Sequence, residues 1–279
     1  KFEKVKLLNE ENKIKIKLSS ISWDELFKDK SILFNAICDL ILDEKNLLYY
    51  ATQKESTKTI IDTRKYVDSL IRNNNLIYAI NDVFNHLGWN NEINIENTRF
   101  QGDLAEYLMN ILLDKFTNVE TLISKISFKT SSKMSVYGND NVYFDYENDI
   151  LYFCESKFYQ NADEGLEEAL KSIEQHSTIE EISFVRDHTS TFIAENGEKR
   201  IRIAEKYENA YIDNLNIRSI IFVMNQNIFK KESYEEMLIN FFGNEETLHK
   251  KTAEIILVFL PILSKQEFLD FFVRRVNNG

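Results

Sequence analysis

The segment from Asp149 to Tyr159 constrains the fold of this chain most strongly, because it places two charged residues inside an apolar run. Its sequence, Asp-Ile-Leu-Tyr-Phe-Cys-Glu-Ser-Lys-Phe-Tyr, is dense in aromatic and aliphatic residues and predicts a buried strand. Side chains alternate between the faces of a strand, so Glu155 and Lys157 point to the same face. Charged side chains are seldom buried unless they pair or bind a metal. The fold must therefore compensate an acid and a lysine within a sheet.

A second strand is predicted immediately upstream, and the two segments together indicate a β-hairpin. The first arm, Val136 to Phe144, alternates apolar and polar residues toward its end, and Tyr146 to Asp149 supplies polar turn residues. Antiparallel pairing would bring Asp140, near the start of the first arm, beside Glu155. In a magnesium-dependent nuclease, two acids and a lysine on adjacent strands bind the metal ion and position the attacking water. Our hypothesis is that this hairpin forms such a site.

The hypothesis assigns a role to each polar residue. Asp140 and Glu155 would share a divalent cation, Mg²⁺ or Mn²⁺, with help from the backbone carbonyl of Ser156. Mg²⁺ prefers oxygen ligands and keeps several waters, so this set is sufficient. The cation would acidify a water and polarise the scissile phosphate. Lys157 would orient or deprotonate that water and neutralise charge on the phosphate. Glu106, on a preceding helix, is a further candidate ligand, although an exposed helical glutamate is the alternative.

The acid–lysine pair also has a plainer interpretation. A buried Glu–Lys ion pair can fix strand register without any chemistry. The acid-x-Lys pattern alone is not specific, because it also occurs at Glu11–Lys13 and Asp43–Lys45, where the surroundings are polar. The copy at Glu155 differs in its apolar flanks and in the Gly-x-Asp one hairpin upstream. On the residues alone, the catalytic and the structural interpretation both stay open.

The order of patterns along the chain predicts the fold class. From residue 98 onward, beside the hairpin, we expect helices at 98–116, 162–175, 232–242 and 264–276, one or two more within 179–211, and strands at 121–129, 217–224 and 253–260. Such an order favours an α/β fold in which helices flank a central mixed sheet.

The part of the chain before residue 96 has a different pattern of predicted elements. It is a mostly helical lobe with short strands, and its expected elements are a Lys-alternating strand in 13–18, a helix from Trp23 to about Lys45 capped by Ser22, and helices near 60–72 and 75–87. An Asn-rich polar segment at 90–97 marks the expected boundary. We therefore predict two domains, residues 1–95 and 96–279.

The net charge limits how the chain can meet nucleic acid. Its 279 residues are 43% hydrophobic, which suffices for a sizeable core, and the formal net charge is −11. Phosphate contacts supply most non-specific affinity for DNA, so this acidity disfavours tight autonomous binding. The negative net charge is compatible with a nuclease subunit whose DNA is delivered by a basic partner, or whose acidic residues bind Mg²⁺.

Several other site classes are disfavoured. Cys38 and Cys154, the only two cysteines, lie in apolar periodic runs and indicate core positions in a reducing cytosol. The four histidines lack a His or Cys partner at zinc-ligand spacing, and no Gly-rich phosphate loop is present. The longest apolar run, 255–263, is too short to span a bilayer. We expect a soluble, cytoplasmic protein that makes no membrane contact.

Three motifs carry a resemblance to a known family: Gly-Asp-Leu-Ala-Glu at 102–106, Gly-Asn-Asp at 138–140 and Glu-Ser-Lys-Phe-Tyr at 155–159. In this set the chain resembles the PD-(D/E)xK nuclease superfamily. With the later Ile-Leu-Val-Phe-Leu-Pro-Ile-Leu segment at 256–263, it resembles more narrowly the HamA family, the nuclease subunits of the bacterial Hachiman antiphage system. The resemblance covers residues of about 98–263 and implies a restriction-endonuclease-like core in the 96–279 domain.

The resemblance also implies an activity and a partner. It implies a DNase that forms a heterodimer with a superfamily 2 helicase (HamB-like) and is held in check until the helicase meets phage or damaged DNA. By motif position, Glu106, Asp140, Glu155 and Lys157 would form the active site. Two alternatives remain: a catalytically inactive nuclease-fold scaffold that binds a helicase, and a restriction-type endonuclease that reads DNA by itself. The missing basic face disfavours the second.

Overall fold

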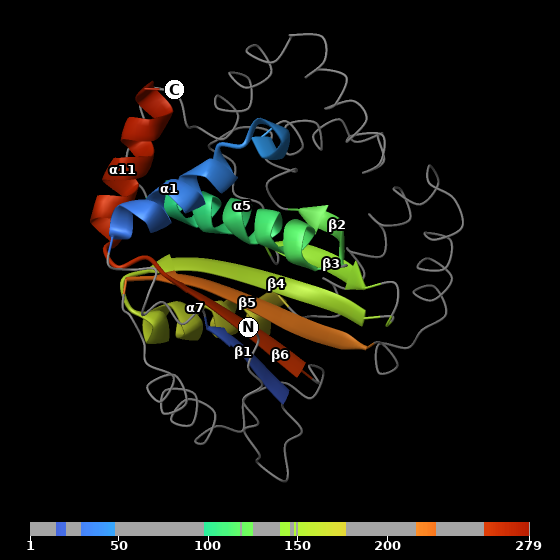
Figure 1. Ribbon diagram of the computed structural model, residues 1–279. Helices are drawn as coiled ribbons and strands as arrows, with labels where there is room; N and C mark the ends of the chain where they lie inside the picture. Colours follow the sequence, from blue (N-terminus) through green and yellow to red (C-terminus); the bar gives the residue numbers. More distant parts are fainter. Residues whose placement is uncertain are drawn as a thin grey trace.

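The computed structural model describes residues 15–20, 29–47, 98–117, 119–124, 140–145, 148, 150–176, 216–226 and 254–278. Within them, six strands form one mixed sheet in the order β1-β6-β5-β4-β3-β2 (Figure 1). Their bounds are β1 (Lys15–Ser20), β2 (Glu120–Ser124), β3 (Asn141–Asp145), β4 (Ile150–Tyr159), β5 (Ile217–Asn225) and β6 (Glu254–Pro261). Strands β1, β6, β5 and β4 run parallel, whereas β3 is antiparallel to both β4 and β2. The predicted mixed α/β architecture is thereby confirmed.

Helices cover both faces of this sheet (Figure 1). On one face lie α5 (Thr98–Phe116), α1 (Lys30–Ile41) and α11 (Lys265–Asn278), and on the other lies α7 (Ala162–His176). Helix α1 packs against both α5 and α11. Its contact with α11 includes an edge-to-face pair of Phe34 and Phe268, whose ring centroids are 5.4 Å apart, and an ion pair of Asp39 with Arg275 at 2.6 Å.

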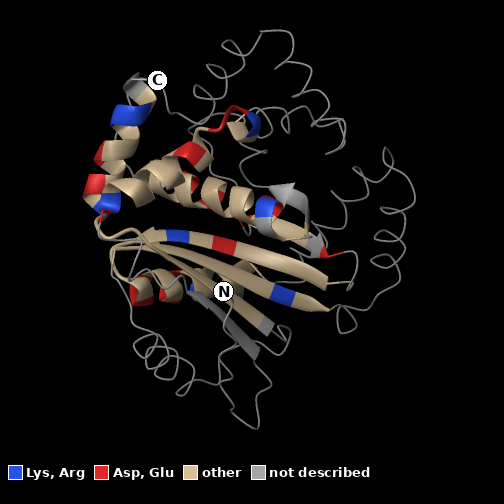
Figure 2. Ribbon diagram, in the orientation of Figure 1, with Lys and Arg blue, Asp and Glu red and all other residues tan. Residues whose placement is uncertain are grey.

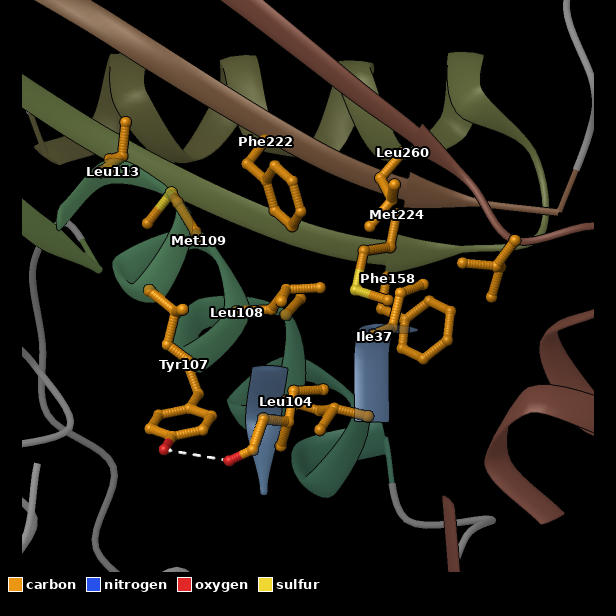
Figure 3. Packing of buried hydrophobic residues seen from close by; sticks show 14 of the residues in the cluster. Ile37, Leu104, Tyr107, Leu108, Met109, Leu113, Phe158, Phe222, Met224 and Leu260 are labelled. Atoms are coloured by element: carbon orange, nitrogen blue, oxygen red, sulfur yellow. Dashed lines mark hydrogen bonds between the residues drawn. The ribbon is translucent and has the colours of Figure 1, made fainter. Parts of the chain in front are cut away.

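The α5 face of the sheet holds the larger hydrophobic core. Residues of α5 such as Leu104, Leu108 and Met109 point toward side chains of β4, β5 and β6 (Figure 3). Because side chains alternate along a strand, these are the even-numbered residues: Tyr152, Cys154 and Phe158 of β4 and Ile220, Phe222 and Met224 of β5. The buried Tyr107 hydroxyl donates to the backbone carbonyl of Ile41 at 3.2 Å, which ties α5 to the end of α1.

The α7 face receives the odd-numbered residues, and this face therefore carries Glu155 and Lys157. Helix α7 buries one apolar stripe there, made of Ala162, Leu166, Ala169, Leu170 and Ile173. It approaches the sheet closely at Gly165, where an added Cβ would lie only 2.7 Å from Cγ1 of Val223 and 3.4 Å from Cβ of Tyr159. A glycine at this position thus sets the distance between α7 and the strand that bears the acid–lysine pair.

Most elements expected after residue 98 are confirmed. These are the hairpin of β3 and β4, the strands β2, β5 and β6, and the helices α5, α7 and α11. Ser264 caps α11 as expected, since its hydroxyl accepts from the Glu267 backbone N–H at 3.4 Å. The helices expected near 60–72, 75–87, 179–211 and 232–242 lie outside the described residues.

The helix expected from Trp23 to Lys45 is wrong as one continuous element. Asp29 adopts an extended conformation, and α1 begins only at Lys30. The Asp29 carboxylate accepts a hydrogen bond from the Ser31 backbone N–H at 2.9 Å and so caps the helix start. A short polar side chain that satisfies an end N–H favours a helix boundary there over continuation.

The proposed boundary at residues 90–97 also lies outside the described residues, and the two-domain organisation stays a prediction. Two elements that precede it are described. Strand β1 pairs in parallel with β6, from Lys15 opposite Glu254 to Ser20 opposite Phe259, and α1 contributes Leu33, Phe34 and Ile37 to the core on the α5 face. Among the described helices, none has the length and apolarity needed to cross a membrane.

The close approach at Gly165 generates a stability prediction. We expect Gly165→Ala to lower the free energy of unfolding by about 1–2 kcal/mol, because overpacking against Val223 outweighs the gain in helix propensity. Gly102→Ala in α5 is the matched control: no atom of the described residues lies within 4 Å of a Cβ there, so it should gain up to about 1 kcal/mol. Urea unfolding measures both, and equal behaviour would contradict the packing argument.

Candidate active site

The hairpin places Asp140 next to Glu155, as the sequence predicts. The pairing of β3 with β4 runs from Asp145 opposite Ile150 to Asn141 opposite Cys154. Asp140 is one residue beyond the last pair, and Glu155 is one residue beyond it on the other strand. The two acids therefore lie together where β3 begins. Glu155 and Lys157 are the only charged residues of β4, and Figure 2 shows this acidic and this basic segment close together on an otherwise uncharged strand.

Glu155 is a buried acid with incomplete compensation. Its side chain is 3% exposed, and its Oε1 accepts from Lys157 Nζ at 2.6 Å. Among the described residues, no hydrogen-bond donor reaches its Oε2. Burial and the neighbouring Asp140 carboxylate raise the pKa of Glu155 to about 7, although Lys157 and the Ser172 hydroxyl of α7 act in the opposite direction. One lysine thus does not offset the cost of placing this carboxylate in the sheet.

Lys157 stays an ammonium ion at neutral pH. Burial by itself lowers its pKa, but Glu155 and Asp140 together more than offset this effect, so the pKa lies above the ordinary lysine value. Its side chain remains 23% exposed. Of the two roles that the sequence leaves open, orienting a water or taking its proton, this electrostatic environment favours the first, because a general base must be unprotonated.

Asp140 is held by Ser156, the residue between the acid and the lysine. Its Oδ2 accepts two hydrogen bonds of 2.8 Å, one from the backbone N–H and one from the hydroxyl of Ser156. Backbone groups of a strand alternate between its two neighbours, and Leu151 donates toward the β5 side, to Asn216. The N–H and carbonyl of Ser156 therefore face the β3 side. That direction is compatible with the predicted role of the Ser156 carbonyl as a metal ligand.

Glu106 is buried, at 3% exposure, in the first half of α5. The alternative of a solvent-exposed helical glutamate is therefore wrong. Helix α5 covers the face of the sheet opposite to α7, whereas Glu155 belongs to the α7 face. Within the described part of the chain, no group of three or more His, Cys, Asp or Glu side chains is arranged to hold a metal ion. A ligand role for Glu106 stays a prediction.

The residues at the start of β3 fit a hard divalent cation. Two neighbouring carboxylates share one lysine in a largely buried position, and Oε2 of Glu155 has no hydrogen-bond partner among the described residues. All candidate donor atoms are oxygens, and Mg²⁺ needs only one or two carboxylates because it keeps much of its water shell. Asp140 and Glu155 could hold Mg²⁺ or Mn²⁺ without a third acid.

One residue that supports the strand of the candidate site could not be identified from the sequence. Lys265, the first residue of α11, donates from Nζ to the backbone carbonyl of Phe158 at 2.7 Å and lies 4.7 Å from the centroid of the Phe158 ring. Burial lowers the pKa of Lys265. This contact fixes β4 directly after Lys157. No local pattern could have revealed it, since the two partners are 107 residues apart.

Comparison with known proteins adds one match. A protein-family model described as HamA matches residues 2–276, nearly the whole chain. No curated protein matches the sequence. The match extends well beyond the motifs of β4 and α5 and includes β1 and α1.

The raised pKa of Glu155 predicts a pH-dependent stability in the absence of metal. Between its ordinary value of 4.5 and about 7, the folded chain binds a proton that the unfolded chain releases. The contribution of this carboxyl to stability is therefore fully present below about pH 4.5 and is lost as pH rises through about 7. From about pH 5 to pH 8, the unfolding free energy of the parent relative to Glu155→Gln should fall by roughly 1–3 kcal/mol.

Urea unfolding in a chelating buffer at several pH values measures this difference. Glu167→Gln, which removes the charge of an exposed acid of α7, is the control for the loss of a carboxylate outside the buried site. A flat difference for Glu155→Gln would show that its carboxyl titrates in the folded chain as it does in the unfolded one.

Proposed function

The chain belongs to the HamA family of the bacterial Hachiman antiphage defence system, and from that premise we propose that it is a metal-dependent deoxyribonuclease of the PD-(D/E)xK type. The observation that carries the proposal is the incompletely compensated carboxylate of Glu155, whose Oε2 has no partner among the described residues and which adjoins a second acid, Asp140. A site built only for stability gains nothing from that second acid, because like charges placed together raise the cost of burial.

Each residue has a role in phosphodiester hydrolysis. Asp140 and Glu155 would hold Mg²⁺ or Mn²⁺ together with the Ser156 backbone carbonyl. When bound, such a cation polarises the phosphate and lowers the pKa of a coordinated water. Lys157, as an ammonium ion beside Glu155, would donate to the attacking water or to a phosphate oxygen and stabilise the negative charge that develops there. Glu106, buried in α5, would assist as a further ligand, directly or through a water.

The fold supports this assignment. The central mixed sheet with helices on both faces is the architecture that the PD-(D/E)xK resemblance implies. In it, β3 delivers the first acid, and β4, a central strand, delivers the acid–lysine pair. A central strand paired on both sides gives catalytic groups a rigid support.

DNA would reach this site with the help of a partner. Because its net charge is −11, the chain by itself would bind the negatively charged DNA backbone weakly. We propose that a helicase partner (HamB-like) in the same complex binds DNA and presents a strand to the start of β3. The partial exposure of Lys157 is consistent with access from that side.

The second candidate function is a catalytically inactive scaffold for the helicase. One observation favours it: Lys157 and Glu155 form a direct ion pair at 2.6 Å, which is also the geometry of a purely structural pair. The two functions predict different consequences when the pair is altered, because a scaffold does not require metal or a reactive carboxylate.

The nuclease proposal predicts that Glu155→Gln and Lys157→Met each abolish DNA cleavage, with a loss of at least about a hundredfold in rate. The measurement is cleavage of plasmid and linear DNA by the partner-bound complex with Mg²⁺ and ATP. Glu167→Gln and Lys171→Met are matched controls, because they remove an exposed acid–lysine ion pair of 2.8 Å on α7, and they should cut at the parent rate.

Thermal melting and partner binding of each variant complete the experiment. If the site variants stay folded and bound but no longer cut, the acid–lysine pair is catalytic. If the parent complex leaves DNA intact with metal and ATP present, or if the site variants cut as fast as the parent, the scaffold function takes the place of the nuclease.

A further inference from the structure

The side chain of Ser156 occupies a position that metal chemistry at this site does not by itself require. A backbone carbonyl can be supplied by any residue between the acid and the lysine, yet this chain has a serine there. Its hydroxyl is buried with the residue at 4% exposure and donates to Asp140 Oδ2 at 2.8 Å. The backbone N–H of the same residue donates to the same oxygen, also at 2.8 Å.

Two donors on one oxygen restrict the Asp140 carboxylate more than one donor does. The N–H lies on β4 beyond the last described pair of β3 and β4, and it donates to the side chain of Asp140. The hydroxyl adds a second direction to that of the N–H and thereby restricts the orientation of the carboxylate further.

Burial alone does not account for this hydroxyl. Ser219 on the adjacent strand β5 is also fully buried, and its Oγ has no hydrogen-bond partner among the described residues. The same sheet therefore accommodates a buried serine without an acceptor. The Ser156 hydroxyl differs from it in reaching a candidate metal ligand.

We propose that the Ser156 hydroxyl is a positioning group, which orients the Asp140 carboxylate for a divalent cation shared with Glu155 and so sets the metal affinity of the site. The inference rests on the proposed metal-dependent function. It deepens that function by assigning the Ser156 side chain a role distinct from that of its backbone carbonyl. Groups that orient metal ligands through hydrogen bonds typically change metal affinity tenfold to a hundredfold when they are removed.

The test measures metal binding directly. The purified chain of 279 residues is titrated with Mn²⁺, and the signal of the free ion in electron paramagnetic resonance gives the dissociation constant. Four proteins are compared: the parent, Ser156→Ala, Ser219→Ala and Glu155→Gln. Thermal melting of each protein in a chelating buffer reports its stability without metal. Ser219→Ala is the matched control, because it removes a buried serine hydroxyl from the neighbouring strand and leaves Asp140 untouched.

We expect Ser156→Ala to weaken Mn²⁺ binding about tenfold or more while its metal-free melting temperature stays within a few degrees of the parent. Ser219→Ala should bind Mn²⁺ as the parent does, and Glu155→Gln should lose the site. The inference is overturned if Ser156→Ala binds like the parent, or if Ser219→Ala weakens binding equally. It is also overturned if Ser156→Ala no longer folds without metal, because the hydroxyl would then serve the fold in general.

The outcomes separate this inference from the proposed function. If the parent itself binds no Mn²⁺, or if Glu155→Gln binds it as tightly as the parent, the metal site is absent and the proposed function fails with it. If the parent binds and Glu155→Gln does not, the site stands, and Ser156→Ala alone decides the role of the hydroxyl.

Discussion

The buried carboxylate of Glu155 is the constraint on which the surrounding structure depends, because its neighbours must compensate its charge. Glu155 sits on the α7 face of a central strand, where water cannot solvate it, and its charge is only partly offset by Lys157. A second acid lies at its side, held by both donors of Ser156. The arrangement concentrates two carboxylates and one ammonium group where β3 begins. Such a concentration costs stability and is typical of sites that bind cations.

The part of this arrangement that follows from alternation along a strand was predictable. The shared face of Glu155 and Lys157, the hairpin and the position of Asp140 all depend on a period of two and on local pairing, and the structure confirms them. The Ser156 hydroxyl was not predictable, because alternation directs its side chain away from Glu155. Its contact with Asp140 arises only because that acid reaches past the end of the pairing between β3 and β4.

Contacts between residues far apart in the chain could not be predicted from the sequence, for a different reason. The contact of Lys265 with the Phe158 carbonyl and the pairing of β1 with β6 join residues more than one hundred positions apart, and no local pattern encodes such partners. Glu106 illustrates the converse. Its motif makes it a candidate ligand, but the helix that carries it covers the opposite face of the sheet from Glu155. A motif specifies which residues occur together, whereas the packing of helices on a sheet decides how near they come.

The pairing of β1 with β6 has a consequence for the order in which the molecule can be assembled. Lys15 lies opposite Glu254, so β1 can pair with its neighbour in the sheet only after β6 has been synthesised. The contact that anchors the end of β4 also waits, because Lys265 follows β6. A nascent or truncated chain that ends before β6 lacks both the β1–β6 pairing at one edge of the sheet and the Lys265 contact at the end of β4. The strand that carries the acid–lysine pair therefore receives its support from α11 only after residue 265 has been synthesised.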